Sequence, residues 1–455
     1  MSEPASIRPP QTPASRPASR QSWLAAQGRL PLAFMGLALI WLAIGTGLLV
    51  IRPGLLAMPH AAPPVIALTH SWMLGFFVTV ACGAVYQLVP VALTTTLWNE
   101  NLGWWHFGMH AVGVPGMVYF FQGYQLKEVG LFGSVVALGI LCFTVNTWIT
   151  VGRSARRDAV AWSIILAAGW LLFAVLAGLF LVFNRLWAWV PVPPLALLRA
   201  HAHLGLIGFF LALLQGVAFQ LIPMFTMGEV RDWGAAKAGL WFAQLGLVAL
   251  VPALIWQWTV LTYLGAVAVT IGMVFSGYGL KQSLATRKKR KLDPGITVFL
   301  RGGIGLAAAA LAGVALTLPD STRSTAVGGF NPIIYGLCGI LGGLLPCIAG
   351  MMCKVVPFLT WMRVYGPLVG RRPTPPAHSL TQPHLERWGL GLQQLSVLPL
   401  LAGAWLLNDF WLRLGTSLLA VGVILFLMDM AGVLKHLWFP AAAPAPTPAL
   451  KPKLT

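Results

Sequence analysis

The sequence predicts an all-α, polytopic membrane protein with about twelve transmembrane helices. Hydrophobic residues make up 58% of the 455 residues and charged residues only 9%, which is more apolar surface than a soluble globule of this length could bury. Apolar stretches of spanning length recur along the chain, and one helical pattern returns at a fixed interval. We therefore expect a single transmembrane domain over 31–440, between disordered cytoplasmic tails at 1–30 and 441–455.

The twelve expected helices follow from the apolar stretches, each long enough to cross the hydrocarbon core. They lie near 31–51, 65–92, 104–124, 129–152, 159–183, 195–225, 236–256, 258–280, 298–318, 328–358, 388–407 and 411–433. Twelve helices over three repeats give four helices to each repeat. The expected pseudo-repeats cover about 31–157, 158–292 and 293–440.

The repeat is clearest in the second and sixth stretches. His70 and His203 lie 133 residues apart, and the glycines, glutamines and prolines that follow them keep the same interval. A third copy lies 134 residues further on, with Leu337 at the histidine position. One helix type is therefore used three times, and two of its copies carry an imidazole. At the glutamine position the third copy has Lys354, which we expect at the inner membrane border, with its ammonium group reaching water.

The net charge of +19 is a signal of topology. Lysines and arginines cluster before the first stretch and after the fourth, eighth, tenth and twelfth, and all these clusters fall on one side if both termini are cytoplasmic. No basic stripe with interleaved aromatic residues occurs, so we expect no binding to nucleic acid. The expected location is the inner membrane of a bacterium, with membrane lipid as the surrounding partner. The oligomeric state stays open.

The histidines fall into two groups by expected depth. His70, His201 and His203 are predicted near the outer surface, and His106 and His110 at the inner end of the third helix. A lone intramembrane histidine is usually a hydrogen-bonded packing residue, but two at equivalent repeat positions favour a metal-ligand role. The i, i+4 spacing of His106 and His110 can chelate a metal, and an interfacial role beside neighbouring tryptophans is the alternative.

Only one histidine of the sixth helix can face a given site. Two residues of separation correspond to about 200° of rotation, so His201 and His203 point to nearly opposite faces. The repeat alignment selects His203 as the partner of His70, and Arg199 lies one turn nearer the outer surface on the face of His203. Two axial imidazoles with a guanidinium above them suit a b-type haem whose propionates bind arginine. The predicted haem ligands are therefore His70 and His203, and His201 is the alternative to His203, because the sequence does not show which of the two faces the bundle interior.

A family resemblance rests on these residues. Twelve helices in three repeats, with histidines near the outer ends of the second and sixth, resemble subunit I of the haem-copper oxidase and nitric oxide reductase superfamily. The stretch from His201 to Gly205, with the sequence HAHLG, is similar to the openings of the NnrS-type haem proteins and the related short oxidase-like proteins. The resemblance implies a low-spin haem ligand at His70, a copper-supplying helix at His203, oxidoreductase chemistry and a cytochrome or other redox partner.

The sequence also departs from that superfamily. The seventh stretch, 236–256, has no histidine pair, the tenth has Leu337 at the histidine position, and Asp429 is the only acidic residue expected inside a span. A copper-haem dioxygen site would lack most of its nitrogen ligands. We therefore expect a haem protein that is not a proton-pumping terminal oxidase, acting in electron transfer, in binding nitric oxide or another diatomic, or in metallocofactor handling. The alternative is a transporter without a cofactor.

Overall fold

The computed structural model describes residues 28–318 and 332–440 and confirms an all-α protein, with no strand among these residues. The long elements are α2 (Arg29–Ile51), α3 (Pro63–His70), η2 (Ser71–Val78), α4 (Thr79–Ala92), α5 (Glu100–Gln122), α6 (Leu126–Gly152), α7 (Ala159–Trp187), α8 (Pro194–His203), η3 (Leu204–Leu211), α9 (Ala212–Thr226), α10 (Trp233–Trp256), α11 (Thr259–Ala285), α12 (Pro294–Leu316), α14 (Pro332–Gly339), η4 (Ile340–Leu344), α15 (Leu345–Val364), α16 (Pro383–Leu406) and α17 (Asp409–Leu434). The predicted tails lie outside the described residues, except that α2 already begins at Arg29.

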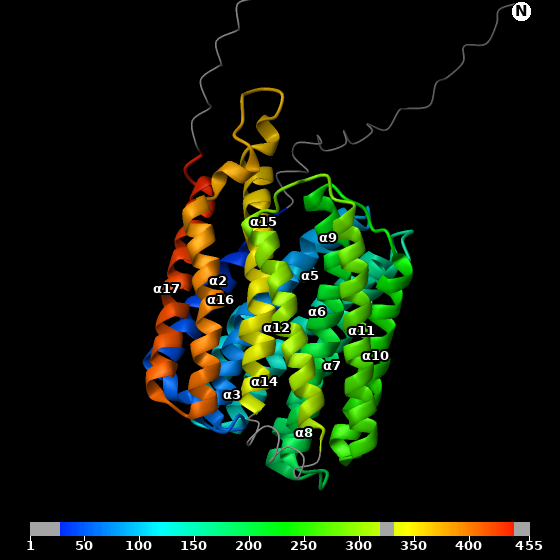
Figure 1. The fold of residues 1–455 in the computed structure, drawn as a ribbon, viewed down its shortest axis with the longest axis vertical. Coiled ribbons are helices and arrows are strands. Elements are labelled where there is room, and N and C mark those ends of the chain that lie inside the picture. The colour runs from blue at the N-terminus through cyan, green and yellow to red at the C-terminus, as the bar shows by residue number, and fades with distance from the viewer. Residues whose placement is uncertain (1–27, 319–331, 441–455) are drawn as a thin grey trace, which may run out of the picture.

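The elements form membrane-length helices that stand side by side in one bundle (Figure 1). Within the described residues, eleven helical stretches are long and apolar enough to cross a membrane. The remaining long helix, α5, has 23 residues but carries Glu100, His106 and His110, which make it less apolar. Each predicted stretch corresponds to one of these twelve, with ends that differ by several residues.

The two ends of the bundle are distinguished by their loops. The start of α2, the end of α17 and the loop between α11 and α12 lie at one end, whereas α3, α8 and α14 begin at the other (Figure 1). The basic segments 153–157, 287–291 and 363–372 also follow helices that finish at the first end. We call it the basic end. An even number of crossings explains why the chain enters and leaves the bundle there.

This arrangement gives a test of orientation. A single cysteine introduced at Lys288 into a variant whose native cysteines are replaced should be labelled by a membrane-impermeant reagent only from the cytoplasmic side, because basic loops are retained there. The measurement compares labelling of intact and opened cells or spheroplasts. A cysteine at Pro59, in the loop at the opposite end, serves as the reciprocal control. Labelling of Lys288→Cys from outside would contradict the predicted orientation.

Three helices of the bundle share the same local departure from α geometry. The π-helical segment η2 follows His70, and the π-helical segment η3 follows His203. The two segments lie 133 residues apart, which is the length of one repeat. A third π-helical segment, η4, lies in the corresponding helix α14–α15. A π turn holds more residues than an α turn, so it disturbs the carbonyl ladder and is common at functional sites. The equivalent helices of the three repeats are therefore deformed at corresponding places.

Glycines in these three helices allow close contact with the first helix of the same repeat. A Cβ atom on Gly83 would lie 2.6 Å from Cβ of Phe34 in α2, and one on Gly208 would lie 2.7 Å from Cβ of Trp170 in α7. In the third repeat, Gly350 packs against the backbone of Gly295 in α12. Small residues let transmembrane helices approach closely, so these glycines serve helix packing.

Lys354 does not reach water in the way its position predicted. Its Nζ lies 2.6 Å from Oδ2 of Asp293, the N-cap residue of α12, and the side chain is 16% exposed. The equivalent place in the second repeat holds Gln220, whose Oε1 accepts a hydrogen bond of 3.2 Å from Arg156. The prediction of a snorkelling lysine is wrong, because a carboxylate on the neighbouring helix is a closer partner than bulk water.

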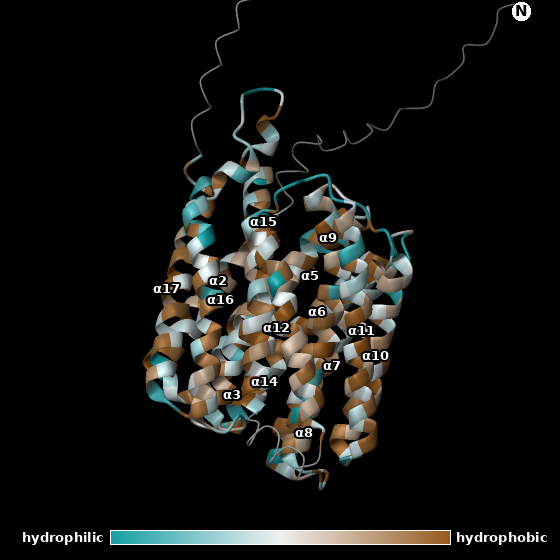
Figure 2. Cartoon of the chain, viewed as in Figure 1, coloured by the Kyte–Doolittle hydropathy of each residue, from teal (hydrophilic) through white to brown (hydrophobic). Residues whose placement is uncertain are grey.

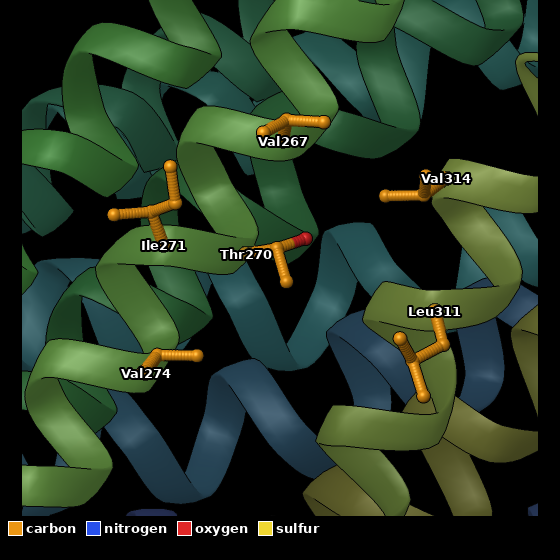
Figure 3. Close-up of a pocket in the computed structure, with 6 residues that line it drawn as sticks. All are labelled: Val267, Thr270, Ile271, Val274, Leu311 and Val314. Atoms are coloured by element: carbon orange, nitrogen blue, oxygen red, sulfur yellow. The ribbon is translucent and has the colours of Figure 1, made fainter.

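Hydrophobic residues fill the middle of the bundle and polar residues gather at its ends (Figure 2). An apolar groove of about 310 Å³ opens between α11 and α12, lined by Val267, Thr270, Ile271, Val274, Leu311 and Val314. Figure 3 shows the side chains of the two helices on either side of this gap. The hydroxyl of Thr270 donates to the carbonyl of Ala266 at 2.9 Å, so the groove presents an apolar wall.

Candidate functional site

Two histidines from different repeats come together near the end opposite the basic end. The ring centroids of His70 in α3 and His201 in α8 lie 6.1 Å apart, and the ring planes are within 12° of parallel. Both residues are partly buried, and the rings make no hydrogen bond to each other. Two metal–nitrogen bonds of about 2 Å, with about 1 Å more from each nitrogen to its ring centre, give a ring separation of roughly 6 Å when both nitrogens point at the metal. The pair therefore has the spacing of two imidazoles on one metal.

The hydrogen bonds of the pair define which nitrogen is free. Nδ1 of His70 donates to the carbonyl of Ile66 at 2.8 Å, and Nδ1 of His201 donates to the carbonyl of Ala174 at 2.8 Å. A carbonyl can only accept, so each Nδ1 carries the proton and each Nε2 keeps its lone pair. Within the described part of the chain, neither Nε2 has a hydrogen-bond partner. This is the tautomer and the supporting bond found in metal-binding histidines.

The neighbouring helices hold both rings in place. In α7, Gly178 lies one turn after Ala174, and a Cβ atom on it would lie 3.0 Å from Cε1 of His201. From α5, Phe121 stacks on His70 with ring centroids 4.9 Å apart. Sequence reasoning did not identify these three residues, because a carbonyl, a glycine and a phenylalanine carry no recognisable metal-binding signal.

The structure corrects the predicted pairing. His203 faces Tyr335 of α14, with ring centroids 5.9 Å apart and planes within 17° of parallel, while His201 turns toward His70. The expectation that His201 faces away from His70 is wrong. The two histidines of α8 do point to different neighbours, as their spacing predicted. The error lies in assuming that equivalent residues of two repeats must face each other.

The pair of His203 and Tyr335 has no ring nitrogen free to bind a metal ion. Nδ1 of His203 donates to the carbonyl of Arg199 at 2.7 Å, and Nε2 lies 3.3 Å from the Tyr335 hydroxyl, which can donate to it. A metal between two ligand atoms needs about 4 Å. The His203–Tyr335 pair resembles the His70–His201 pair in ring spacing and angle. The Tyr335 hydroxyl, however, lies where a metal ion would have to bind.

Arg199 lies on the side of His203, as predicted, and is exposed. Its charge acts on His60 and His203. Burial, with the charge of Arg199 as a second cause, lowers the pKa of His60 in the loop before α3. Within the described residues, Arg199 does not act in this way on His70 or His201. The proposed propionate contact of Arg199 therefore stays a prediction.

His106 and His110 are completely buried within the bundle. This contradicts the interfacial alternative for the two residues. Nδ1 of His106 lies 3.0 Å from the hydroxyl of Tyr86, and Nε2 of His110 contacts Oγ1 of Thr79 at 2.8 Å and the carbonyl of Leu74 at 3.1 Å. One nitrogen of each ring is thus engaged with protein, and the other, His106 Nε2 or His110 Nδ1, is buried without a partner.

The contact of His110 explains part of the π-helix. Leu74 lies inside η2, and its carbonyl accepts from both the Thr79 hydroxyl, at 2.9 Å, and His110. A π-helical segment disturbs the regular backbone hydrogen bonds, and a carbonyl left unpaired in an apolar bundle is costly, so side-chain donors stabilise it. His110 therefore has a structural role in supporting the deformed helix that carries His70.

We predict that His110→Ala destabilises the protein by about 2–4 kcal/mol, because it removes a donor from a buried carbonyl and leaves a cavity. The midpoint of thermal unfolding in detergent measures the loss. Thr79→Val is the matched control: it keeps the side-chain shape and leaves His110 on Leu74, so the loss should be about 1 kcal/mol. Equal effects of the two changes would contradict the role assigned to His110.

A bare metal ion does not suit these histidines. Across residues 28–318 and 332–440, no group of three or more His, Cys, Asp or Glu side chains could hold a metal ion. A haem needs only axial ligands from the protein, because the porphyrin supplies the other four nitrogens. The His70–His201 pair offers two nitrogen ligands, which is the number a haem takes from protein, whereas a zinc or copper ion needs a larger protein ligand set.

No model of a known protein family matches the chain, and no curated protein matches it.

Proposed function

We propose that the protein is a membrane haem protein that transfers electrons through one b-type haem held by His70 and His201. The observation that carries the proposal is the pairing of two near-parallel imidazoles 6.1 Å apart, each with Nδ1 bonded to a backbone carbonyl and Nε2 without a protein partner. When bound, the haem would supply reversible one-electron chemistry.

The residues favour electron transfer over the other tasks expected of a haem protein. With His70 and His201 both holding the haem, no iron position would remain for nitric oxide or another diatomic. Ala174 and Gly178 in α7 and Phe121 in α5 restrict movement of the two rings, and a rigid ligand set lowers the cost of changing the charge on the iron. The partner proposed is a cytochrome or another one-electron carrier. An oxidase-type copper centre is not included.

The likeness to subunit I of the haem-copper oxidase superfamily remains part of this proposal. The twelve long helices are compatible with it, and α10 has no histidine at all. The proposed ligands, His70 and His201, lie on the second and sixth helices. His203 is not a ligand, because its ring lies against Tyr335. The proposed protein is therefore a haem-binding relative in architecture, without dioxygen chemistry.

Visible spectroscopy of the purified full-length protein tests the proposal. We expect about one haem per chain in a pyridine haemochrome assay, a matching iron content, and a sharp low-spin reduced spectrum that carbon monoxide does not change. A reduced spectrum that shifts with carbon monoxide would show an open iron position and exclude two histidine ligands. Protein that carries no haem even when expressed with added haem precursor would favour the cofactor-free transporter.

A further inference from the structure

A second group of ionisable side chains lies at the basic end, between the ends of α12, α15, α16 and α17, and two of its carboxyl groups are buried. It contains Asp293, Lys354, Glu386 and Asp429, with Lys289 at its edge. Glu386 lies inside α16 and is 5% exposed, so the expectation that only Asp429 enters a span is wrong. The predicted span began at residue 388, two residues too late to include this carboxylate.

Two of the three carboxyl groups have partners that favour a negative charge. Asp293 is the N-cap of α12 and pairs with Lys354 at 2.6 Å and Lys289 at 2.8 Å. Burial alone would raise the pKa of Asp293, but these two lysines outweigh it and hold the pKa below its usual range. Glu386 accepts from the backbone N–H of Gly295 at 3.2 Å, at the N-terminus of the same helix, and lies within electrostatic reach of Lys354, although the carboxyl groups of Asp293 and Asp429 oppose its charge. A helix N-terminus stabilises anions.

Asp429 has no such support. Its Oδ1 accepts the backbone N–H of Gln382 at 2.6 Å, but its Oδ2 is buried without a partner, and the residue is 0% exposed. The side chains that face it electrostatically are Glu386 of α16 and Cys353 of α15. Neither is a cation. Within the described residues, α2 and the short helix η7 (Lys435–Leu437) also pack on α17, but neither places a cation in electrostatic contact with Asp429.

The charges of the group do not balance. Asp293, Glu386 and Asp429 would carry three negative charges when ionised, against two positive charges on Lys289 and Lys354. An uncompensated carboxylate in a buried, water-poor place is expensive, and it is avoided by binding a proton. A sodium ion would need several oxygen ligands, whereas a proton needs one free carboxylate oxygen.

We propose that this group is a proton-binding site and that Asp429 carries the proton on Oδ2 at neutral pH. The site takes up one proton at the basic end of the third repeat, independently of any haem. The balance is simple: Asp429 gains one O–H bond, and the net charge of the group changes from −1 to zero.

Infrared spectroscopy of the full-length protein tests this directly. A protonated carboxylic acid has a carbonyl stretch that a carboxylate lacks, so we expect this band in wild type at pH 7. Carbon-13 labelling of aspartate should shift the band, and Asp429→Asn should remove it. Asp158→Asn is the matched control, since Asp158 caps α7 and pairs with Arg156, and its loss should leave the band unchanged.

Three results would overturn the proposal. Wild type without a carboxylic-acid band would show that all three carboxyl groups are ionised. A band that is insensitive to aspartate labelling would place the proton on a glutamate, and this readout does not depend on whether Asp429→Asn folds. A band that sodium removes at constant pH, while potassium does not, would identify a cation site. None of these measurements depends on haem content.

Discussion

His201→Ala should lose most of its haem, or keep it in a changed state, whereas His203→Ala should retain a wild-type spectrum. The reason is the pairing in the structure: the ring of His201 faces His70 across 6.1 Å with its Nε2 free, while Nε2 of His203 contacts the Tyr335 hydroxyl. Removing one axial ligand leaves a five-coordinate, high-spin iron that binds carbon monoxide. Haem per protein and reduced spectra with and without carbon monoxide measure the effect.

The two variants are matched controls for each other, because the residues lie on one turn of α8 and both changes remove an imidazole. His70→Ala should behave like His201→Ala, since it removes the other ligand of the pair. Loss of haem in His203→Ala, together with a normal spectrum in His201→Ala, would restore the pairing expected from the repeat alignment and refute the one described here.

Tyr335→His should create a second site with the geometry of the first. The rings of His203 and Tyr335 already lie 5.9 Å apart and within 17° of parallel, and the tyrosine hydroxyl is the group that fills the space for a metal. An imidazole in its place would leave two facing nitrogens. We expect haem content to rise to about two per chain, with a second low-spin signal in the spectrum.

Tyr335→Phe is the control, since it removes the hydroxyl but supplies no nitrogen. Its haem content should equal that of wild type. If Tyr335→His also binds no more haem than wild type, although it folds and keeps the first haem, then ring spacing alone does not make the site. The surroundings of His70, such as the contact with Phe121, would then be a further requirement.

The repeat explains why alignment chose the wrong partner. Call the position of His70, His203 and Leu337 the later position, and that of Leu68, His201 and Tyr335 the earlier position. The later residue of the first repeat faces the earlier residue of the second, and the later residue of the second faces the earlier residue of the third. The two contacts run head to tail from one repeat to the next, so unlike faces meet. The remaining pair would be Leu337 and Leu68, and both are buried in the same core cluster.

The inner histidines show a second limit of sequence reasoning. The i, i+4 spacing of His106 and His110 correctly places both on one face of a helix. It does not reveal which neighbour that face meets, and the neighbour is the carbonyl of Leu74 in the π-helical segment η2. The prediction that Lys354 reaches water is wrong for the same reason, since its partner Asp293 belongs to another helix.

Composition, hydrophobic length and the 133-residue interval were enough to predict the helical class and the approximate helix bounds, because these depend on local burial in a bilayer and on covalent order. The tertiary structure alone decided which histidines meet, which are sealed inside and which carboxyl group lacks a partner. Those properties depend on the rotation and contact of helices distant in the chain. Near-parallel rings, a carbonyl acceptor on α7 and an unpaired oxygen on Asp429 arise only when the faces of separate helices are brought together.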